Sequence, residues 1–165
     1  MLAKFKLLLV FATCIGCLLG CSSYSNKVSE GYPPIQLGDD RNDAFSKCEK
    51  VGEVQYTISG LSGKNEDYLF YAGSSKTGNI DRIAVFTLKK ELVSAEGFEP
   101  VARECLTNLE LPMPLSDIEA QIGTIHFDNG SGIYLPSYVT REASIISLQC
   151  SDDMVYGIIE SDIYP

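Results

Sequence analysis

The sequence has few of the side chains that carry out acid–base, nucleophilic or metal chemistry. His126 is the only histidine, which excludes a histidine-rich metal site and any mechanism that needs two histidines. Ser131 lacks the glycine spacing of a nucleophile elbow, and a hairpin turn accounts for both Gly130 and Gly132. We therefore expect no Ser/His/Asp hydrolase and, more generally, no enzyme.

Cofactor-binding patterns are also scarce. Residues 73–78 (GSSKTG) have part of a phosphate-binding loop, but Ser75 stands where a glycine must precede the lysine. The side chains of Asp128, Asn129 and Ser131 offer oxygen atoms without the spacing of a calcium-binding loop. We expect no metal and no cofactor other than a covalent lipid. The lipid is expected from the N-terminal sequence.

Residues 1–20 have the features of a secretory signal peptide. Lys4 and Lys6 give the segment a positive start, and an uncharged apolar run of thirteen residues extends from Leu7 to Leu19. A membrane-spanning helix needs about 20 apolar residues, and polar residues follow directly after Cys21. The leader is therefore expected to be cleaved.

The end of the leader, Leu18-Leu19-Gly20-Cys21, resembles the lipobox of bacterial lipoproteins. Among the three cysteines of this region, only Cys21 has a leucine three positions before it and a glycine directly before it. The resemblance implies that Cys21 becomes the lipidated N-terminus, with palmitate or a similar chain attached. Each buried methylene contributes about 0.8 kcal/mol, and two or more chains anchor a protein stably.

The residue after the cysteine indicates which membrane holds the anchor. In lipoproteins of this type an aspartate at that position tends to retain the protein in the inner membrane, and this chain has Ser22. The resemblance therefore implies the outer membrane, and we expect the protein to face the periplasm.

Three cysteines remain after Cys21, namely Cys48, Cys105 and Cys150, and none belongs to a Cys-x-x-Cys pair. Thioredoxin-like and zinc-knuckle sites therefore have no support. An oxidising periplasm permits one disulfide, and we favour Cys105 with Cys150 because both lie in the second half. Such a bridge would stabilise the fold by about 4 kcal/mol in the chain-entropy treatment.

Basic residues are few and unevenly placed. Without the leader, the chain has eleven lysines and arginines against twenty-two aspartates and glutamates, a formal charge of −11. This charge disfavours nucleic acid and anionic lipid headgroups as partners. Arg141 is the only basic residue after Arg103, in a segment that has ten acidic residues.

The acidic second half has two interpretations. It can be a solvated surface that keeps the protein soluble, or a docking face for a cationic protein whose association would be salt-sensitive, because exposed charges are screened beyond about 8 Å. The candidate residues for such a face are Asp117, Glu119, Asp128, Asp152 and Asp153.

The residue pattern predicts an α+β fold in which short helices pack on antiparallel sheet. Residues 21–34 are typical of a lipidated cysteine followed by a flexible tether, and residues 35–165 of the folded domain. A helix is predicted over 40–51, capped by Asp39 or Asp40, with one apolar face. That face comprises Ala44, Phe45, Cys48 and Val51.

A second helix is predicted over 100–109, and a third begins with a capping box formed by Ser116 and Glu119 and ends at Gly123. Asp128-Asn129-Gly130 favours a tight hairpin turn. Runs of β-branched and aromatic residues predict the strands. These lie at 54–59, 67–72, 80–88, 91–97, 122–127, 132–135, 143–150 and 154–159.

Segments 35–98 and 110–165 each contain a short helix, a closing glycine and a series of strands, which makes a repeat of about 70 residues plausible. Leu37-Gly38-Asp39-Asp40 leading to 52–54, and residues 114–119 leading to 122–124, resemble the BamE/SmpA family. In doubled form they resemble the β-lactamase-inhibitor-protein fold. The resemblance implies a small module that works by protein contact.

These features together favour an outer-membrane-anchored periplasmic lipoprotein that binds another envelope protein, as an accessory of outer-membrane assembly or as a structural adaptor. The alternative is an inhibitor or immunity lipoprotein that neutralises a basic secreted or lytic enzyme. An enzyme or a small-ligand carrier would instead need a deep apolar pocket with a perturbed ionisable group.

Overall fold

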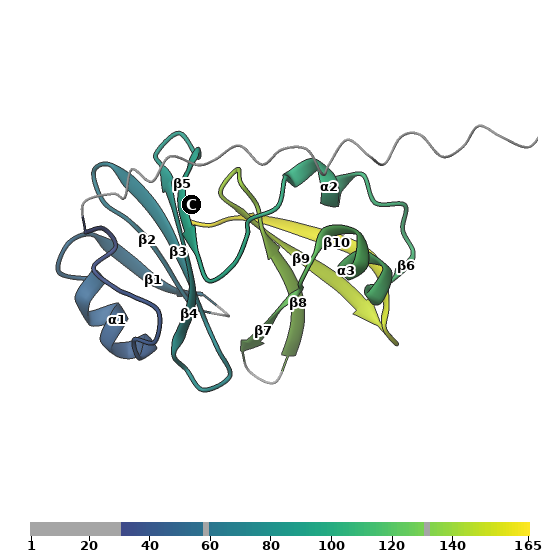
Figure 1. Ribbon diagram of the computed structural model, residues 1–165, viewed down its shortest axis with the longest axis horizontal. Coiled ribbons are helices and arrows are strands. Elements are labelled where there is room, and N and C mark those ends of the chain that lie inside the picture. The colour runs from purple at the N-terminus through teal and green to yellow at the C-terminus, as the bar shows by residue number, and fades with distance from the viewer. Residues whose placement is uncertain (1–30, 58–59, 131–132) are drawn as a thin grey trace, which may run out of the picture.

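The computed structural model describes residues 31–57, 60–130 and 133–165, and within these the side chains of 127–130 and 133–135 are outside the description. The described chain forms two five-stranded antiparallel sheets and three short helices (Figure 1). The predicted α+β class is confirmed, with more sheet than helix.

The first sheet is a meander in which each strand pairs with the next. Its strands are β1 (Glu53–Thr57), β2 (Gly60–Lys64), β3 (Tyr68–Ser74), β4 (Ile80–Thr87) and β5 (Leu92–Glu96). Helix α1 (Arg41–Cys48) covers one face, where Phe70 and Val85 contact it through a shared apolar cluster. On the other face Leu69 and Phe86 are buried against the second half. Strand β4 is thus covered on both faces.

The second sheet has the strand order β6, β10, β9, β8, β7. The bounds are β6 (Met113–Pro114), β7 (His126–Gly130), β8 (Ile133–Val139), β9 (Ser144–Ser151) and β10 (Met154–Asp162). Helices α2 (Arg103–Thr107) and α3 (Leu115–Ile122) pack on one face. Leu106 from α2 and Ile118 from α3 are fully buried against Ile146 and Leu148 of β9.

A third apolar cluster joins the two sheets. Leu69, Tyr71 and Phe86 of the first sheet pack against Val139 of β8 and against Ile163, which follows β10. The C-terminal segment thereby crosses from the second sheet to the first (Figure 1). Tyr164 continues this contact, because its hydroxyl donates a hydrogen bond to the Glu53 carboxylate at 2.8 Å. The two sheets therefore share a core.

The folded region begins before Ile35. Tyr32 and Pro33 are buried, and the Tyr32 ring lies 6.4 Å from that of Tyr68 and 5.7 Å from that of Phe70. The core thus includes a residue three positions before the predicted domain start, because an aromatic ring fills the space beside β3. The leader, Cys21 and the tether as far as residue 30 lie outside the described residues.

The first helix is shorter than its apolar pattern predicts. Asp40 is the N-cap, and its carboxylate accepts hydrogen bonds from the amides of Asn42 and Asp43. The helix ends at Cys48, and Val51 is 49% exposed instead of lying on the buried face. The chain must turn at Gly52 to enter β1, and a side chain there would meet the Lys64 carbonyl.

The predicted capping box of the third helix is wrong. Pro114 is the N-cap of α3 and makes no side-chain cap, because its pairing with Met154 in β10 starts the helix at Leu115. Ser116 lies inside the helix, where its hydroxyl donates to Asp117 at 3.4 Å. Glu119 accepts from the Ile125 amide, also at 3.4 Å. The predicted end at Gly123 is confirmed, with φ of 115°.

Replacing Asp40 and Ser116 separately with alanine tests this difference between the two helix starts. We expect Asp40→Ala to lower the free energy of unfolding by about 1 kcal/mol, because two amides lose their cap. Ser116→Ala is the matched control and is expected to change it by less than about 0.5 kcal/mol. Urea titrations followed by circular dichroism measure both, and an equal loss in the two variants would contradict the assigned caps.

Most predicted strands are present, but two regions differ. The Gly- and Ser-rich segment 60–64 has no strand pattern, yet it forms β2 between β1 and β3. Asp128, Asn129 and Gly130 are not a turn but the end of β7, paired with residues 135, 134 and 133 of β8. The two residues between these strands, 131 and 132, lie outside the described residues. The tolerance of Asp, Asn and Gly for positive φ therefore placed the predicted turn too early.

The two halves share a backbone arrangement. The amide of Arg41, the first residue of α1, donates to the carbonyl of Gly78 in the β3–β4 turn at 3.0 Å. The amide of Leu115, the first residue of α3, donates to the carbonyl of Asp153 in the β9–β10 turn at 2.8 Å. The residue before each helix pairs with the residue after that turn, Asp40 with Asn79 and Pro114 with Met154. By these contacts β4 corresponds to β10.

Candidate interaction surface

Three of the five acidic residues proposed as a docking face come from the same end of the molecule. Asp152 and Asp153 form the turn between β9 and β10, and Asp117 lies in the first turn of α3. The hydrogen bond from the Leu115 amide to the Asp153 carbonyl holds these segments together. In Figure 1 this end, with β6 and α3, lies opposite α1. All three side chains are exposed, and none makes an ion pair with another described residue.

The β9–β10 turn places its two carboxylates without help from a glycine. Asp152 and Asp153 both have positive φ, 50° and 62°. A two-residue hairpin loop with both residues in this conformation is a type I′ turn, which natural sequences usually build with Asn-Gly or Asp-Gly. Here the second position also has an aspartate. The turn therefore gathers more negative charge than its geometry requires.

The other two proposed residues do not belong with these three. Glu119 is exposed on α3, where one of its oxygens accepts the Ile125 amide. Asp128 is on β7, three strands away from β10 in the second sheet, which corresponds to about 14 Å at the usual strand spacing. The sheet order thus keeps β7, which contains Asp128, apart from the β9–β10 turn.

Several other acids of the second half are neutralised by bases from elsewhere. Lys90, in the β4–β5 connection, pairs with Asp162 at 2.6 Å, and Arg103 of α2 pairs with Glu160 at 2.6 Å. The hydrogen bond from Arg103 lowers the pKa of Glu160. Glu142 accepts the Arg103 amide at 3.1 Å. These charged groups line an open cavity of about 500 Å³ together with Ser144 and Ser161.

The sequence does not predict this cluster of charged residues. The one signal in the sequence is that Arg141 is the only base after Arg103, so most ion pairs of the second half need a base from the first half or the connection. Which acids would be paired depends on the path of 97–103, where Arg141 fixes the chain by donating to the Pro100 carbonyl at 3.0 Å. That path is a tertiary property.

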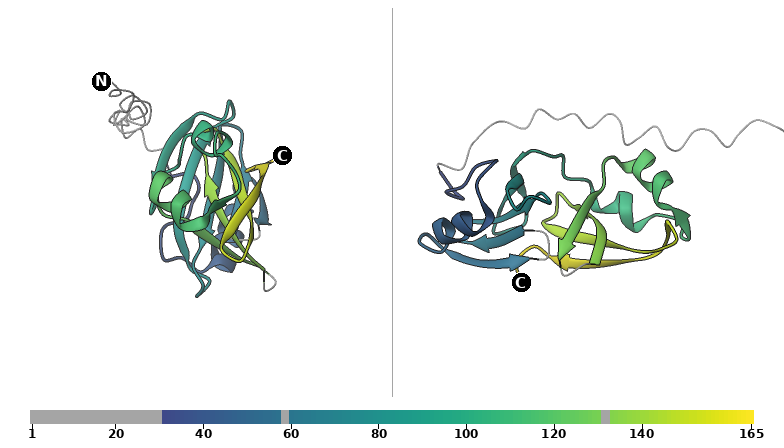
Figure 2. Two further views of the ribbon diagram at one scale, coloured as in Figure 1. Left: turned by 90° about the vertical axis from the view of Figure 1, so that its right-hand side faces the viewer. Right: turned by 90° about the horizontal axis from the view of Figure 1, so that it is seen from below.

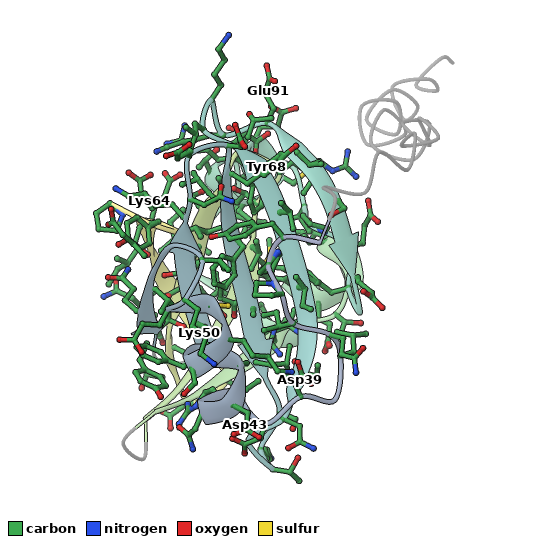
Figure 3. The ribbon with its side chains drawn as sticks, turned by 90° about the vertical axis from the view of Figure 1, so that its left-hand side faces the viewer. Asp39, Asp43, Lys50, Lys64, Tyr68 and Glu91 are labelled. Atoms are coloured by element: carbon green, nitrogen blue, oxygen red, sulfur yellow. The ribbon has the colours of Figure 1, made fainter. Side chains whose placement is uncertain are left out.

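The α1 end of the molecule has side chains of both signs. Figure 3 shows Lys50 and Lys64 on the same side of the molecule as Asp39, Asp43 and Glu91. Lys47 pairs with Asp39 at 2.8 Å, and this hydrogen bond lowers the pKa of Asp39. The first half thus has bases among its acids, whereas Arg141 is the only base after Arg103 in the half that contains α3 and the β9–β10 turn.

His126 occupies a packed position in β7. Its ring meets Phe98 edge-on, with the centroids 5.6 Å apart. Burial, and secondly the guanidinium of Arg82, lower the pKa of His126, while Asp81 has the opposite effect. The imidazole is thus neutral near pH 7. Ser137 donates to its backbone carbonyl, a contact that serves the strand pairing.

Cys48, Cys105 and Cys150 form no disulfide with one another in the structure. The predicted bridge between Cys105 on α2 and Cys150 on β9 is not formed, since the Cys150 thiol instead donates to the Leu148 carbonyl at 3.7 Å. Cys48 is buried in the core of the first half, as its helical position predicts, and burial raises its pKa to about 12. Its thiolate is therefore scarce at neutral pH.

The described parts of the chain contain no group of three or more His, Cys, Asp or Glu side chains placed to hold a metal ion. Searched over the same residues, none of the helices has the length and apolar character needed to cross a membrane.

The comparisons with known proteins leave the fold and the acidic end as the main guides to function. No protein-family model matches the chain, and no curated protein matches it either.

Proposed function

We propose that the chain is a lipid-anchored protein of the outer membrane that faces the periplasm and acts without catalysis by binding another envelope protein. The anchor in this proposal is Cys21, on the strength of the Leu18–Cys21 motif. The observation that carries the binding role is the acidic end formed by Asp117, Asp152 and Asp153. Such an end favours a cationic partner through faster, oriented association.

The proposal includes two tandem units, α1 with β1–β4 and α3 with β7–β10, each a helix followed by a four-stranded meander, and the first unit has β5 in addition. The shared hydrogen bond at the start of α1 and α3 supports it. Arg41 and Leu115 are 74 positions apart, and Asn79 and Met154 are 75 apart. In this correspondence β3 is equivalent to β9 and β4 to β10.

A second candidate function is an inhibitor or immunity lipoprotein that neutralises a basic secreted or lytic enzyme. The concentration of uncompensated carboxylates at one end favours it, because an acidic patch of this kind can cover a basic active-site rim. The two candidates differ in the partner they require and in the salt dependence of its binding.

Capture experiments with the full chain separate these candidates. The tagged protein is recovered from detergent-solubilised envelope at low and at high salt, and a triple variant, Asp117→Asn with Asp152→Asn and Asp153→Asn, is the matched control. Recovery of barrel-assembly components at both salt concentrations supports the assembly role. Recovery of a basic lytic enzyme that is lost at high salt and in the triple variant supports the inhibitor role and overturns the assembly role.

The anchor is tested separately by replacing Cys21 with alanine. We expect the variant to lose lipid labelling and to leave the membrane fraction or to stay unprocessed. Membrane fractionation and metabolic labelling with a palmitate analogue measure this, with Cys17→Ala as the matched control. A Cys21→Ala product with wild-type size, labelling and location would exclude the lipoprotein assignment.

A further inference from the structure

The outer edge of β10 is open over most of its length. β10 has nine residues, but β6 pairs only with Met154 and Val155. Within 31–57, 60–130 and 133–165, no strand pairs with the remaining edge. A β-bulge between Val155 and Gly157 interrupts the pairing with β9, and Figure 2 shows β10 along the outside of the molecule.

The corresponding edge in the first half is closed by a strand. β5 pairs with β4 from Ile83 to Phe86. Because Asn79 corresponds to Met154, residues 158–161 of β10 are the counterpart in the second half of Ile83–Phe86 in β4. The second sheet thus has, among its described residues, no strand where the first sheet has β5.

Two large apolar side chains of β10 are exposed. Tyr156 is 61% exposed and Ile159 54% exposed. Natural edge strands are usually protected by lysine, proline or a covering segment, and residues 156–162 contain neither lysine nor proline. The acidic side chains of Glu160 and Asp162 are already engaged by Arg103 and Lys90. The edge keeps free backbone hydrogen-bonding groups beside apolar contact area, which is what strand addition uses.

The charge around the edge indicates what kind of strand fits. Asp152 and Asp153 precede β10 directly, and Asp117 lies beside their turn. A second copy of this chain would bring two such ends together, each from a half with ten acidic residues and one arginine. The segment 22–30 of the same chain has one lysine, one glutamate and no alternating apolar pattern. An extended segment of another protein that contains lysine or arginine would complement the acidic turn and also pair with the free edge.

We propose that the edge of β10 at 158–161 receives an extended basic segment of a partner protein as an added strand, with Ile159 and Tyr156 as its apolar contacts. The inference rests on the proposed binding function and names the site at which that binding occurs.

Three peptides probe the edge, with the full chain held in phosphatidylcholine nanodiscs. The first is a basic strand-forming peptide of alternating lysine and valine, the second replaces lysine with glutamate, and the third has the basic sequence with a central proline. We expect the first to bind with an affinity that falls as salt rises, and the other two to bind at least tenfold more weakly. Hydrogen exchange should show amide protection confined to 157–161.

Side-chain substitutions at the edge complete the test. Ile159→Lys is expected to weaken binding of the basic peptide at least tenfold, whereas Ile159→Val should stay within twofold. Leu88→Lys is the matched control, because Leu88 is 50% exposed and lies outside the strands of the first sheet. It should leave binding unchanged.

Several outcomes overturn the inference. If the proline peptide binds as tightly as the basic peptide, the interaction depends on charge alone and not on strand pairing. If the basic peptide protects amides of β1, β5 or β7 instead, it binds another sheet edge. If the protein forms a dimer and Ile159→Lys makes it monomeric, the edge binds a second copy of the chain. If amides 157–161 are already protected from exchange without peptide, and deleting residues 22–30 removes that protection, the edge binds that segment. If a captured envelope partner binds Ile159→Lys as well as wild type, the edge inference fails while the proposed function stands.

Discussion

Replacing Ile163 with alanine is expected to lower the free energy of unfolding by about 2–5 kcal/mol, the range for removing a large aliphatic side chain from a core. Ile163 is 1% exposed and packs with Leu69, Tyr71 and Phe86 of the first sheet. Its amide also donates to the Ala143 carbonyl at 3.1 Å. The loss is a large fraction of the 5–15 kcal/mol that typically stabilises a domain.

Ile159→Ala is the matched control for this prediction. Ile159 lies in the adjoining strand but is mostly exposed, so its truncation is expected to change stability by less than about 0.5 kcal/mol. Urea denaturation followed by circular dichroism measures both variants. A loss below 1 kcal/mol in Ile163→Ala would contradict the shared core.

The same experiment reports on how the sheets cooperate. Leu69 and Phe86 belong to the first sheet and Val139 to the second, and all three contribute to the cluster around Ile163. We expect a single transition shifted to lower urea, because unfolding either sheet exposes this cluster. Two separate transitions in Ile163→Ala would show that the halves fold independently once the contact is weakened.

The sequence predicts local structure well where side-chain pattern and burial coincide. The alternating residues of β4 are covered on both faces, and Ala44 and Cys48 face the sheet as the helical spacing indicates. It fails where backbone pairing from a distant segment decides the outcome. The helix start at Leu115 depends on the contact of β6 with β10, which overrides the local preference of Ser116.

The acidic surface shows the same limit. The count of acids after Arg103 indicates a negative second half, but it does not separate the exposed Asp152 and Asp153 from Glu160 and Asp162, which are paired. That distinction follows from the position of Lys90 and Arg103, two bases supplied by the β4–β5 connection and by α2. Charge along a chain thus gives the sign of a surface, and the fold decides where that charge is left uncompensated.

The stability of the protein is expected to fall as the pH drops below about 6.5, because the unfolded chain then binds a proton at His126 that the folded chain resists. The ordinary pKa of histidine is about 6.5, and burial together with Arg82 lowers it in the folded state. Because the pKa of His126 is lower in the folded state, the contribution of this histidine to the free energy of unfolding is fully present above about pH 6.5. That contribution is lost as the pH falls through the folded-state pKa. The slope is at most about 1.4 kcal/mol per pH unit.

Asp39, Glu160 and Cys48, which also have shifted pKa values, titrate outside the pH range in which His126 acts. The carboxyls of Asp39 and Glu160 have lowered pKa values, so their contributions are lost only below about pH 4. Cys48 has a raised pKa, and its contribution is complete below the ordinary thiol value and is lost at alkaline pH. Since His126 is the only histidine, urea titrations from pH 5 to 7.5 isolate it, and His126→Gln should flatten the profile. A wild-type profile that is already flat, or an unchanged slope in His126→Gln, would mean that the imidazole is not held neutral against Phe98.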